Sequence, residues 1–165
     1  MGVRQFGVVF LGVGGVGKTT YIYRLLGVSK RPAVTRRPRW YPLYADRAVI
    51  YLVDVPGQRA VEVAKGYYQA VRAYGVRVDL IVYMYSVVEP ATLDALYEIH
   101  EWAAGVPASA RVLVGNKRDL AEEVGFMVEG DGVAASLNAS RIYYTSALKD
   151  DAASLFRNIA ENLPL

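Results

Sequence analysis

The sequence contains no cysteine among its 165 residues. This absence excludes disulfide bonds, thiolate zinc sites, a cysteine nucleophile and lipid attachment through cysteine. Long apolar runs are also lacking, since the run from Leu80 to Val88 is far shorter than the roughly 20 residues that cross a bilayer. The only histidine is His100, on an expected helix, and we interpret it as a packing or surface residue. We therefore expect a soluble, cytoplasmic protein without an integral membrane segment.

Acidic residues are missing from the first 45 positions, where the charge is entirely positive. Asp46 is the first acid, and eight basic residues precede it: Arg4, Lys18, Arg24, Lys30, Arg31, Arg36, Arg37 and Arg39. Because the net charge of the chain is +3, the remainder is net acidic. The basic third indicates either a polyanionic ligand or partner or a solvated surface, and both interpretations stay open. Peripheral contact with an anionic membrane or with RNA is a weaker alternative, because no recognisable nucleic-acid module is present.

The composition is that of one globular domain. Apolar residues make up 53% of the chain and charged residues 21%, and neither repeats nor a low-complexity linker interrupt it. A chain of this length buries roughly 70% of the surface that it exposes when unfolded. We therefore expect a single domain over residues 1–165. The excess of arginine over lysine favours a thermophilic prokaryotic source.

Strand-like and helix-like segments alternate along the chain. The pattern predicts strands near residues 4–11, 40–46, 47–55, 79–87, 110–116 and 141–147, with the second and third as an antiparallel pair. It predicts helices near residues 18–27, 61–75, 90–105 and 149–163. Such alternation is typical of an α/β fold with a mostly parallel sheet and helices on both faces.

The stretch GVGGVGKTT, Gly12 to Thr20, follows the first strand and opens the first helix. It fits the spacing GxxxxGK[ST], in which glycines let several backbone N–H groups approach a phosphate at once. The helix N-terminus also favours an anion. We expect Lys18 to contact the β- and γ-phosphates and the Thr19 hydroxyl to bind Mg²⁺. The expected phosphate-binding residues are Gly12, Gly14, Gly15, Val16, Gly17, Lys18, Thr19 and Thr20.

The stretch NKRD, Asn116 to Asp119, follows a buried strand and indicates the base. Guanine presents two adjacent donors, its N1–H and its exocyclic amine, and a carboxylate accepts both. Asp119 is therefore the expected guanine ligand. We expect Asn116 to donate to a ring nitrogen and Lys117 to lie along the base plane.

The stretch DVPGQ, Asp54 to Gln58, ends the third strand and indicates hydrolysis. Asp54 at a strand end is placed to hold Mg²⁺ through water. Gly57 can turn its N–H toward a γ-phosphate. The amide of Gln58 both donates and accepts, so it can orient an attacking water. Gln58 and Lys18 are the expected catalytic residues.

Taken in this order, GVGGVGKT, DVPGQ, NKRD and the late TSA at Thr145–Ala147 resemble the small Ras-like and Arf-like GTPases of the P-loop superfamily. The resemblance covers nearly the whole chain. It implies a six-stranded sheet, mostly parallel with one antiparallel strand, and about five helices. It also implies that Ser146 and Ala147 belong to the guanine site, with the backbone of Ala147 meeting the guanine carbonyl.

The resemblance further implies a switch threonine that binds Mg²⁺, and Thr35 is the only threonine between Thr20 and Thr92. Arg36 stands where the family usually has glycine, and Pro56 stands where small GTPases more often have alanine or glycine. Proline fixes φ, so Pro56 is expected to narrow the movement of this segment. Four arginines lie in or beside the expected switches and are candidates for an arginine finger in cis, although a solvent- or partner-facing role is favoured: Arg36, Arg37, Arg39 and Arg59.

These observations predict a guanine-nucleotide switch. It binds GTP or GDP with Mg²⁺, hydrolyses GTP slowly, and changes shape near residues 30–40 and 56–68. The resemblance implies an exchange factor, an activator of hydrolysis and an effector as partners. Two alternatives stay open, namely a GTP-binding scaffold without significant turnover and another P-loop NTPase or kinase.

Overall fold

Six strands form one sheet in the order β2-β3-β1-β4-β5-β6. The computed structural model describes residues 2–29, 37–75 and 77–165. All neighbouring strands pair in parallel except β2 and β3, whose antiparallel register joins Arg39 to Asp54 and Ala45 to Ala48. The strands are β1 Arg4–Leu11, β2 Arg39–Ala45, β3 Ala48–Asp54, β4 Leu80–Ser86, β5 Ala110–Asn116 and β6 Arg141–Tyr144. The predicted α/β architecture with one antiparallel strand is confirmed.

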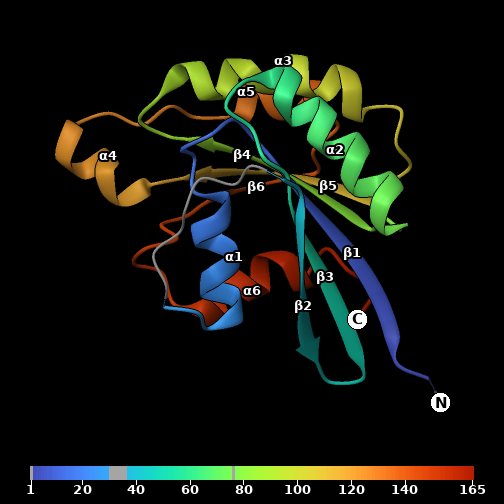
Figure 1. Cartoon of the computed structure of the whole chain (residues 1–165). Helices are drawn as coiled ribbons and strands as arrows, with labels where there is room; N and C mark the ends of the chain where they lie inside the picture. Colours follow the sequence, from blue (N-terminus) through green and yellow to red (C-terminus); the bar gives the residue numbers. More distant parts are fainter. Residues whose placement is uncertain (1, 30–36, 76) are drawn as a thin grey trace.

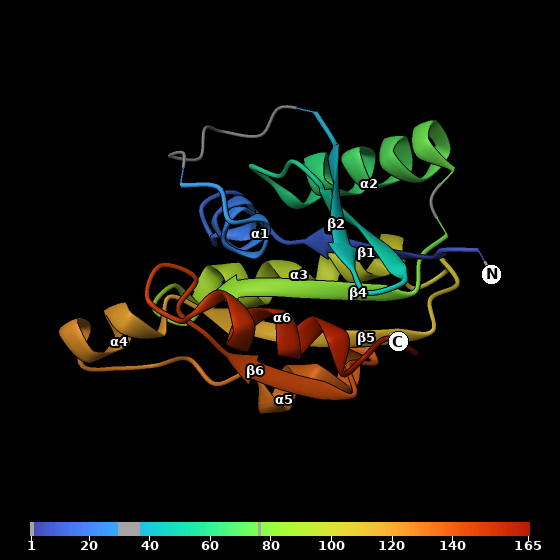
Figure 2. The same cartoon turned by 90° about the horizontal axis from the view of Figure 1, so that it is seen from below.

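Helices cover both faces of this sheet. Figure 1 shows α2, α3 and α5 above the sheet and α1 and α6 below it, and in Figure 2 α6 lies in front of the sheet. Within the described residues the helices are α1 Lys18–Leu26, α2 Ala60–Tyr74, α3 Pro90–Ala103, α4 Arg118–Val124, α5 Asp131–Ala134 and α6 Ala152–Ala160, with a short 3₁₀ helix η1 at Ala135–Leu137. None of these helices is both long enough and apolar enough to span a membrane.

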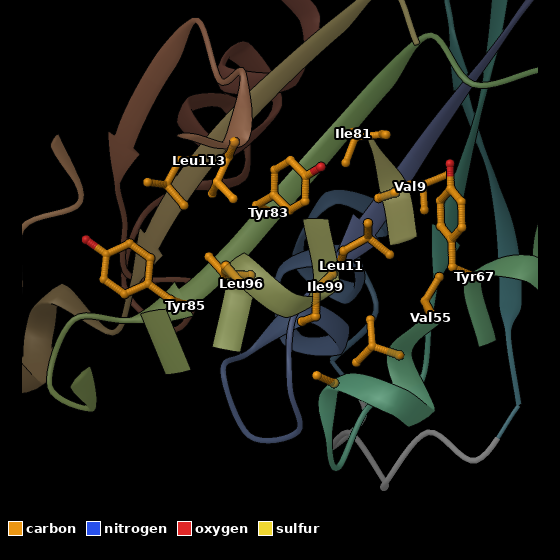
Figure 3. Packing of buried hydrophobic residues seen from close by; sticks show 14 of the residues in the cluster. Val9, Leu11, Val55, Tyr67, Ile81, Tyr83, Tyr85, Leu96, Ile99 and Leu113 are labelled. Atoms are coloured by element: carbon orange, nitrogen blue, oxygen red, sulfur yellow. The ribbon is translucent and has the colours of Figure 1, made fainter. Parts of the chain in front are cut away.

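The core consists of two apolar layers that share the sheet between them. Alternation along β1 sends Val9 and Leu11 to one layer and Val8 and Phe10 to the other. Figure 3 shows the first layer, in which strand residues such as Ile81 pack against α3 residues such as Leu96 and Ile99. All seven residues of β4 are buried, as expected for a strand covered on both faces.

The predicted segments agree with the observed elements to within a few residues, with three differences. Strand β6 ends at Tyr144, because Thr145 and Ala147 in the following segment donate hydrogen bonds to the Asn116 side chain instead of continuing the strand. Helix α6 ends at Ala160, before the predicted residue 163. The pattern also missed α4 and α5, which have only seven and four residues and therefore carry little helical periodicity.

The two edges of the sheet are β2 and β6. Strand β2 contains Pro42, yet its register with β3 runs without a break from Arg39 to Ala45. Proline is tolerated in a strand where its missing N–H lies on the open side, so Pro42 fits an edge position. Strand β6 is short, with four residues.

Gly66 lies inside α2, where glycine costs about 1 kcal/mol relative to alanine. Its position is explained by the close approach of α2 to the end of β3. A Cβ at Gly66 would lie 2.9 Å from Pro56 Cδ and 3.0 Å from Val55 Cγ1. The proline ring is rigid, so it cannot move aside as a flexible side chain would. Glycine at this position lets α2 pack directly on Pro56.

We predict that Gly66→Ala destabilises the protein by about 1–2 kcal/mol, because the overpacking cost exceeds the gain in helix propensity. Chemical denaturation measures the free energy of unfolding. Gly132→Ala is the matched control, since this helical glycine has open space around an added Cβ. Pro56→Ala should reduce the cost of Gly66→Ala. Equal effects of Gly66→Ala in both backgrounds would contradict the proposed contact.

Candidate functional site

The loop between β1 and α1 has the backbone of an anion-binding turn. Gly15 and Gly17 adopt φ values of 83° and 103°, in the left-handed region that favours glycine. Gly17 is the N-cap of α1, and the first turn of that helix contains no acidic residue. The N-terminal amides and the positive end of the helix dipole therefore face the loop, and no acidic residue of the helix's own first turn competes for them.

Lys18 is the buried cation of this loop, with 7% of its surface exposed. Its Nζ donates to the carbonyl oxygens of Gly12 at 2.6 Å and Val13 at 3.1 Å. Burial lowers the pKa of Lys18 to about 8, and the negative charge of Asp54 opposes this shift. A bound polyphosphate would add negative charge near Nζ and favour the protonated form.

Thr19 and Asp54 place two hard oxygen ligands side by side. The Thr19 hydroxyl donates to Asp54 Oδ2 at 2.6 Å, and Asp54 is fully buried at the end of β3. Mg²⁺ prefers oxygen ligands and takes only one or two from protein when phosphates and water supply the others. The residues present therefore fit a magnesium ion bound together with a nucleotide.

The segment after β3 approaches the phosphate loop at Gly14. A Cβ at Gly14 would lie 2.8 Å from the Gly57 carbonyl oxygen and 3.0 Å from Gln58 Oε1. The backbone of this segment is fixed from the other side by Glu62, whose Oε2 accepts from the N–H groups of Gln58 at 2.9 Å and Arg59 at 3.1 Å. The Gln58 side chain is thereby brought to the edge of the phosphate loop.

Asn116 joins three separate segments through one buried side chain. Its Nδ2 donates to the Val16 carbonyl at 2.9 Å, and its Oδ1 accepts from Thr145 Oγ1 at 2.9 Å and from the Ala147 N–H at 3.0 Å. These bonds connect the phosphate loop to the predicted guanine segments. The expected bond from Asn116 to a guanine ring nitrogen stays a prediction, and one N–H of Nδ2 is enough for it.

Lys117 and Asp119, in the same stretch as Asn116, are each held in a specific geometry. Lys117 adopts φ 66°, which is uncommon for a residue with a side chain and often marks a functional segment. Asp119 Oδ1 accepts from Ser146 Oγ at 2.8 Å. Ser146 is therefore placed to orient the carboxylate that is expected to recognise guanine.

A cavity of about 410 Å³ collects most of the predicted site residues. Its lining comes from the phosphate loop, the segment after β3, the residues after β5 and the loop after β6: Gly14, Gly15, Gly17, Lys18, Thr19, Thr20, Asp54, Val55, Pro56, Gly57, Gln58, Asn116, Lys117, Asp119, Leu120, Ala147 and Leu148. The sequence interpretation missed Leu120 and Leu148. Each directly follows a predicted motif and gives the base end of the cavity apolar walls that suit a flat heterocycle.

Some of the predicted site residues do not line the cavity but form hydrogen bonds with residues that do. Gly12 and Val16 contribute carbonyl oxygens to Lys18 and Asn116, and Ser146 contributes its hydroxyl to Asp119. Thr35 and Arg36 lie outside the described residues. Arg37, Arg39 and Arg59 are exposed, and none of the three lines the cavity.

The site can hold a polyanion at one end and a flat base at the other. Lys18 and the start of α1 form the positive end, and Asp119 with the two leucines forms the other. Gln58 is exposed and lines the cavity beside Gly14 of the phosphate loop. The arrangement suits phosphoryl transfer from a nucleotide to water.

Comparison with known proteins agrees with this geometry. No match is found among curated proteins. The profile of a GTPase family, described as 50S ribosome-binding GTPase, matches residues 7–117, which is more than half of the chain. The match includes the phosphate loop, Asp54 to Gln58 and the beginning of the NKRD stretch. The chain therefore belongs to this GTPase domain family, within the P-loop GTPase superfamily.

Proposed function

We propose that the chain is a single G domain, residues 1–165, that acts as a guanine-nucleotide switch and hydrolyses GTP slowly. The observation that carries the proposal is the single cavity shared by the phosphate loop, the Asp54–Gln58 segment and the Asn116–Asp119 segment. Membership of a GTPase family supports nucleotide binding and hydrolysis in general. The residue roles follow from the chemistry of each side chain.

Guanine recognition rests on Asp119. Its carboxylate accepts from N1–H and from the exocyclic amine, a pair of donors that adenine does not present. The hydrogen bond from Ser146 Oγ to Oδ1 fixes the orientation of the carboxylate, and Leu120 and Leu148 flank the same end of the cavity. Ala147 N–H is already held by Asn116, so the proposed contact of Ala147 with the guanine carbonyl requires that this N–H be shared or reoriented.

Hydrolysis rests on positioning and charge. The amides at the start of α1 and the ammonium group of Lys18 stabilise negative charge on the transferring phosphoryl group. Gln58 orients the attacking water from the side of Gly14. Thr19 and Asp54 would hold Mg²⁺, with Thr35 proposed as a further ligand, and the ion neutralises charge on the phosphate oxygens when bound.

Loss of the γ-phosphate removes partners of Gly57 and Thr35, so residues 30–40 and 56–68 are the proposed switches. An exchange factor, an activator of hydrolysis and an effector are the partners that such a switch requires. An arginine finger would come from one of these partners or from the exposed arginines of the chain. A non-hydrolysing scaffold and a different P-loop NTPase are the competing functions.

We predict that the purified protein releases phosphate from GTP in single turnover at about 10⁻⁴–10⁻² s⁻¹, and not measurably from ATP. Gly14→Ala should slow this by about tenfold or more, because the added methyl group displaces Gln58. Gly105→Ala is the matched control, since Gly105 is exposed and its added Cβ meets nothing. Tight GTP binding without turnover would favour the scaffold. Equal use of ATP would exclude the guanine assignment.

A second prediction concerns the base. Asp119→Asn replaces one acceptor oxygen by an amide donor, which suits the C2 carbonyl of xanthine better than the amine of guanine. Affinity for GDP should fall at least tenfold while affinity for xanthosine diphosphate rises, as measured by competition with a fluorescent nucleotide. Asp94→Asn, an exposed change on α3, should alter neither. Unchanged guanine preference in the Asp119 variant would contradict the assignment.

A third prediction follows from Lys18. Its pKa is lowered to about 8 in the nucleotide-free protein, and bound phosphates raise it. At a pH between these two pKa values, Lys18 is largely deprotonated in the free protein and protonated in the complex. GDP binding should therefore take up a proton near pH 8.5. At pH 7 the lysine is already charged and uptake by this group disappears. Calorimetry in buffers of different ionisation enthalpy measures the protons taken up, and equal uptake at both pH values would contradict this origin.

A further inference from the structure

Asp150 contacts three segments around the base end of the cavity, although no motif includes it. Its Oδ2 accepts from the Ser146 N–H at 2.9 Å, and its Oδ1 pairs with Arg118 Nη2 at 2.6 Å. The Asp150 N–H donates to the Ser146 carbonyl at 2.8 Å, and the Asp150 carbonyl accepts from Arg24 Nη2 of α1 at 2.6 Å. One residue thus joins α1, the loop after β6 and the start of α4.

Arg118 is the second member of this arrangement and directly precedes Asp119. Its Nη1 donates to the Tyr144 carbonyl at 2.6 Å, and its backbone N–H donates to the Thr145 carbonyl at 2.9 Å. Together with the bond to Asp150, three contacts tie Arg118 to the loop that carries Ser146. The side chain of Asp119 is held by that same Ser146.

Apolar packing gives helix α4 little support, since Ala121 is its residue that packs, partly buried, against the core. None of its residues is fully buried, and the apolar residues at and just after its end, Val124, Phe126 and Met127, are exposed. Figure 1 shows α4 projecting beyond the sheet. Two parallel hydrogen bonds to guanine require a well-oriented carboxylate, and loss of orientation weakens both. Polar contacts at the N-terminus of α4 therefore set the position of Asp119.

We infer that Asp150 and Arg118 form a clamp that positions Asp119 for guanine and slows nucleotide release. The inference rests on the proposed function, since it assigns positioning residues to the same base site. The clamp acts through Ser146 and the backbone of residues 144–146, and neither Arg118 nor Asp150 lines the cavity.

The test uses two substitutions that open the clamp from opposite sides. Asp150→Asn is isosteric: its oxygen still accepts from the Ser146 N–H, while its amide group faces the guanidinium and the ion pair is lost. Arg118→Ala removes the partner. Arg141→Ala is the matched control, because Arg141 pairs with Glu161 at 3.0 Å and its side chain is 50% exposed, against 48% for Arg118.

Two quantities are measured: the dissociation rate of a fluorescent GDP, and the ratio of affinities for GDP and inosine diphosphate, which lacks the exocyclic amine. Because the ion pair is partly exposed, its loss should have a moderate effect on the rate. Each clamp variant should release GDP about fivefold faster than the wild type. The affinity ratio should fall about threefold. The double variant should resemble the single ones, since both remove the same ion pair. Melting temperatures without nucleotide report whether each variant folds.

The outcomes separate the clamp from the proposed function. If Asp150→Asn and Arg118→Ala give the same GDP dissociation rate and the same affinity ratio as Arg141→Ala, the clamp is overturned. Faster release with an unchanged affinity ratio also overturns it, because general loosening of the fold would affect both nucleotides equally. A wild-type protein that binds ADP as well as GDP contradicts the proposed function itself. Faster release with a reduced ratio, confined to the clamp variants, supports the clamp.

Discussion

The hydrogen bonds of Asn116 are the constraint on which the site depends. Its side chain is 2% exposed and joins the carbonyl of Val16 to the loop at Thr145 and Ala147. A nucleotide site requires a fixed distance between the residues at its phosphate end and those at its base end. The hydrogen bonds of Asn116 hold the phosphate loop and the loop after β6 at such a distance. A buried amide that lost any of these partners would leave a polar group unsatisfied, at about 1–3 kcal/mol. Binding and folding therefore share one set of contacts.

Much of the fold and of the site was predictable because both depend on local spacing. The apolar runs of β4 and β5 are long enough to mark buried strands, and Pro90 marks the start of α3. The carboxyl ends of parallel strands meet at one edge, so residues that follow β1, β3 and β5 come together. Lys18, Asp54 and Asp119 meet in one cavity for this reason.

The parts that escaped prediction depend on contacts between segments distant in sequence. Asp150 and Arg118 each belong to polar stretches that look like ordinary surface, and their pairing across 32 positions appears only in three dimensions. Gly66 looks unfavourable in a helix until Pro56 is seen beneath it. Leu148 looks like a misplaced surface leucine, although it forms part of the cavity wall. The roles of these residues depend on tertiary contacts, which local sequence patterns do not describe.

The edges of the sheet limit how copies of this chain can associate. An open sheet usually risks growing by addition of a strand from another molecule. Here the edge strand β2 contains Pro42, which has no backbone N–H to donate, and β6 offers only four residues for pairing. Neither edge is a good template for a continuous intermolecular sheet of the kind that builds fibrils. Aggregation by strand pairing is therefore disfavoured at these edges, even when the protein is concentrated or heated.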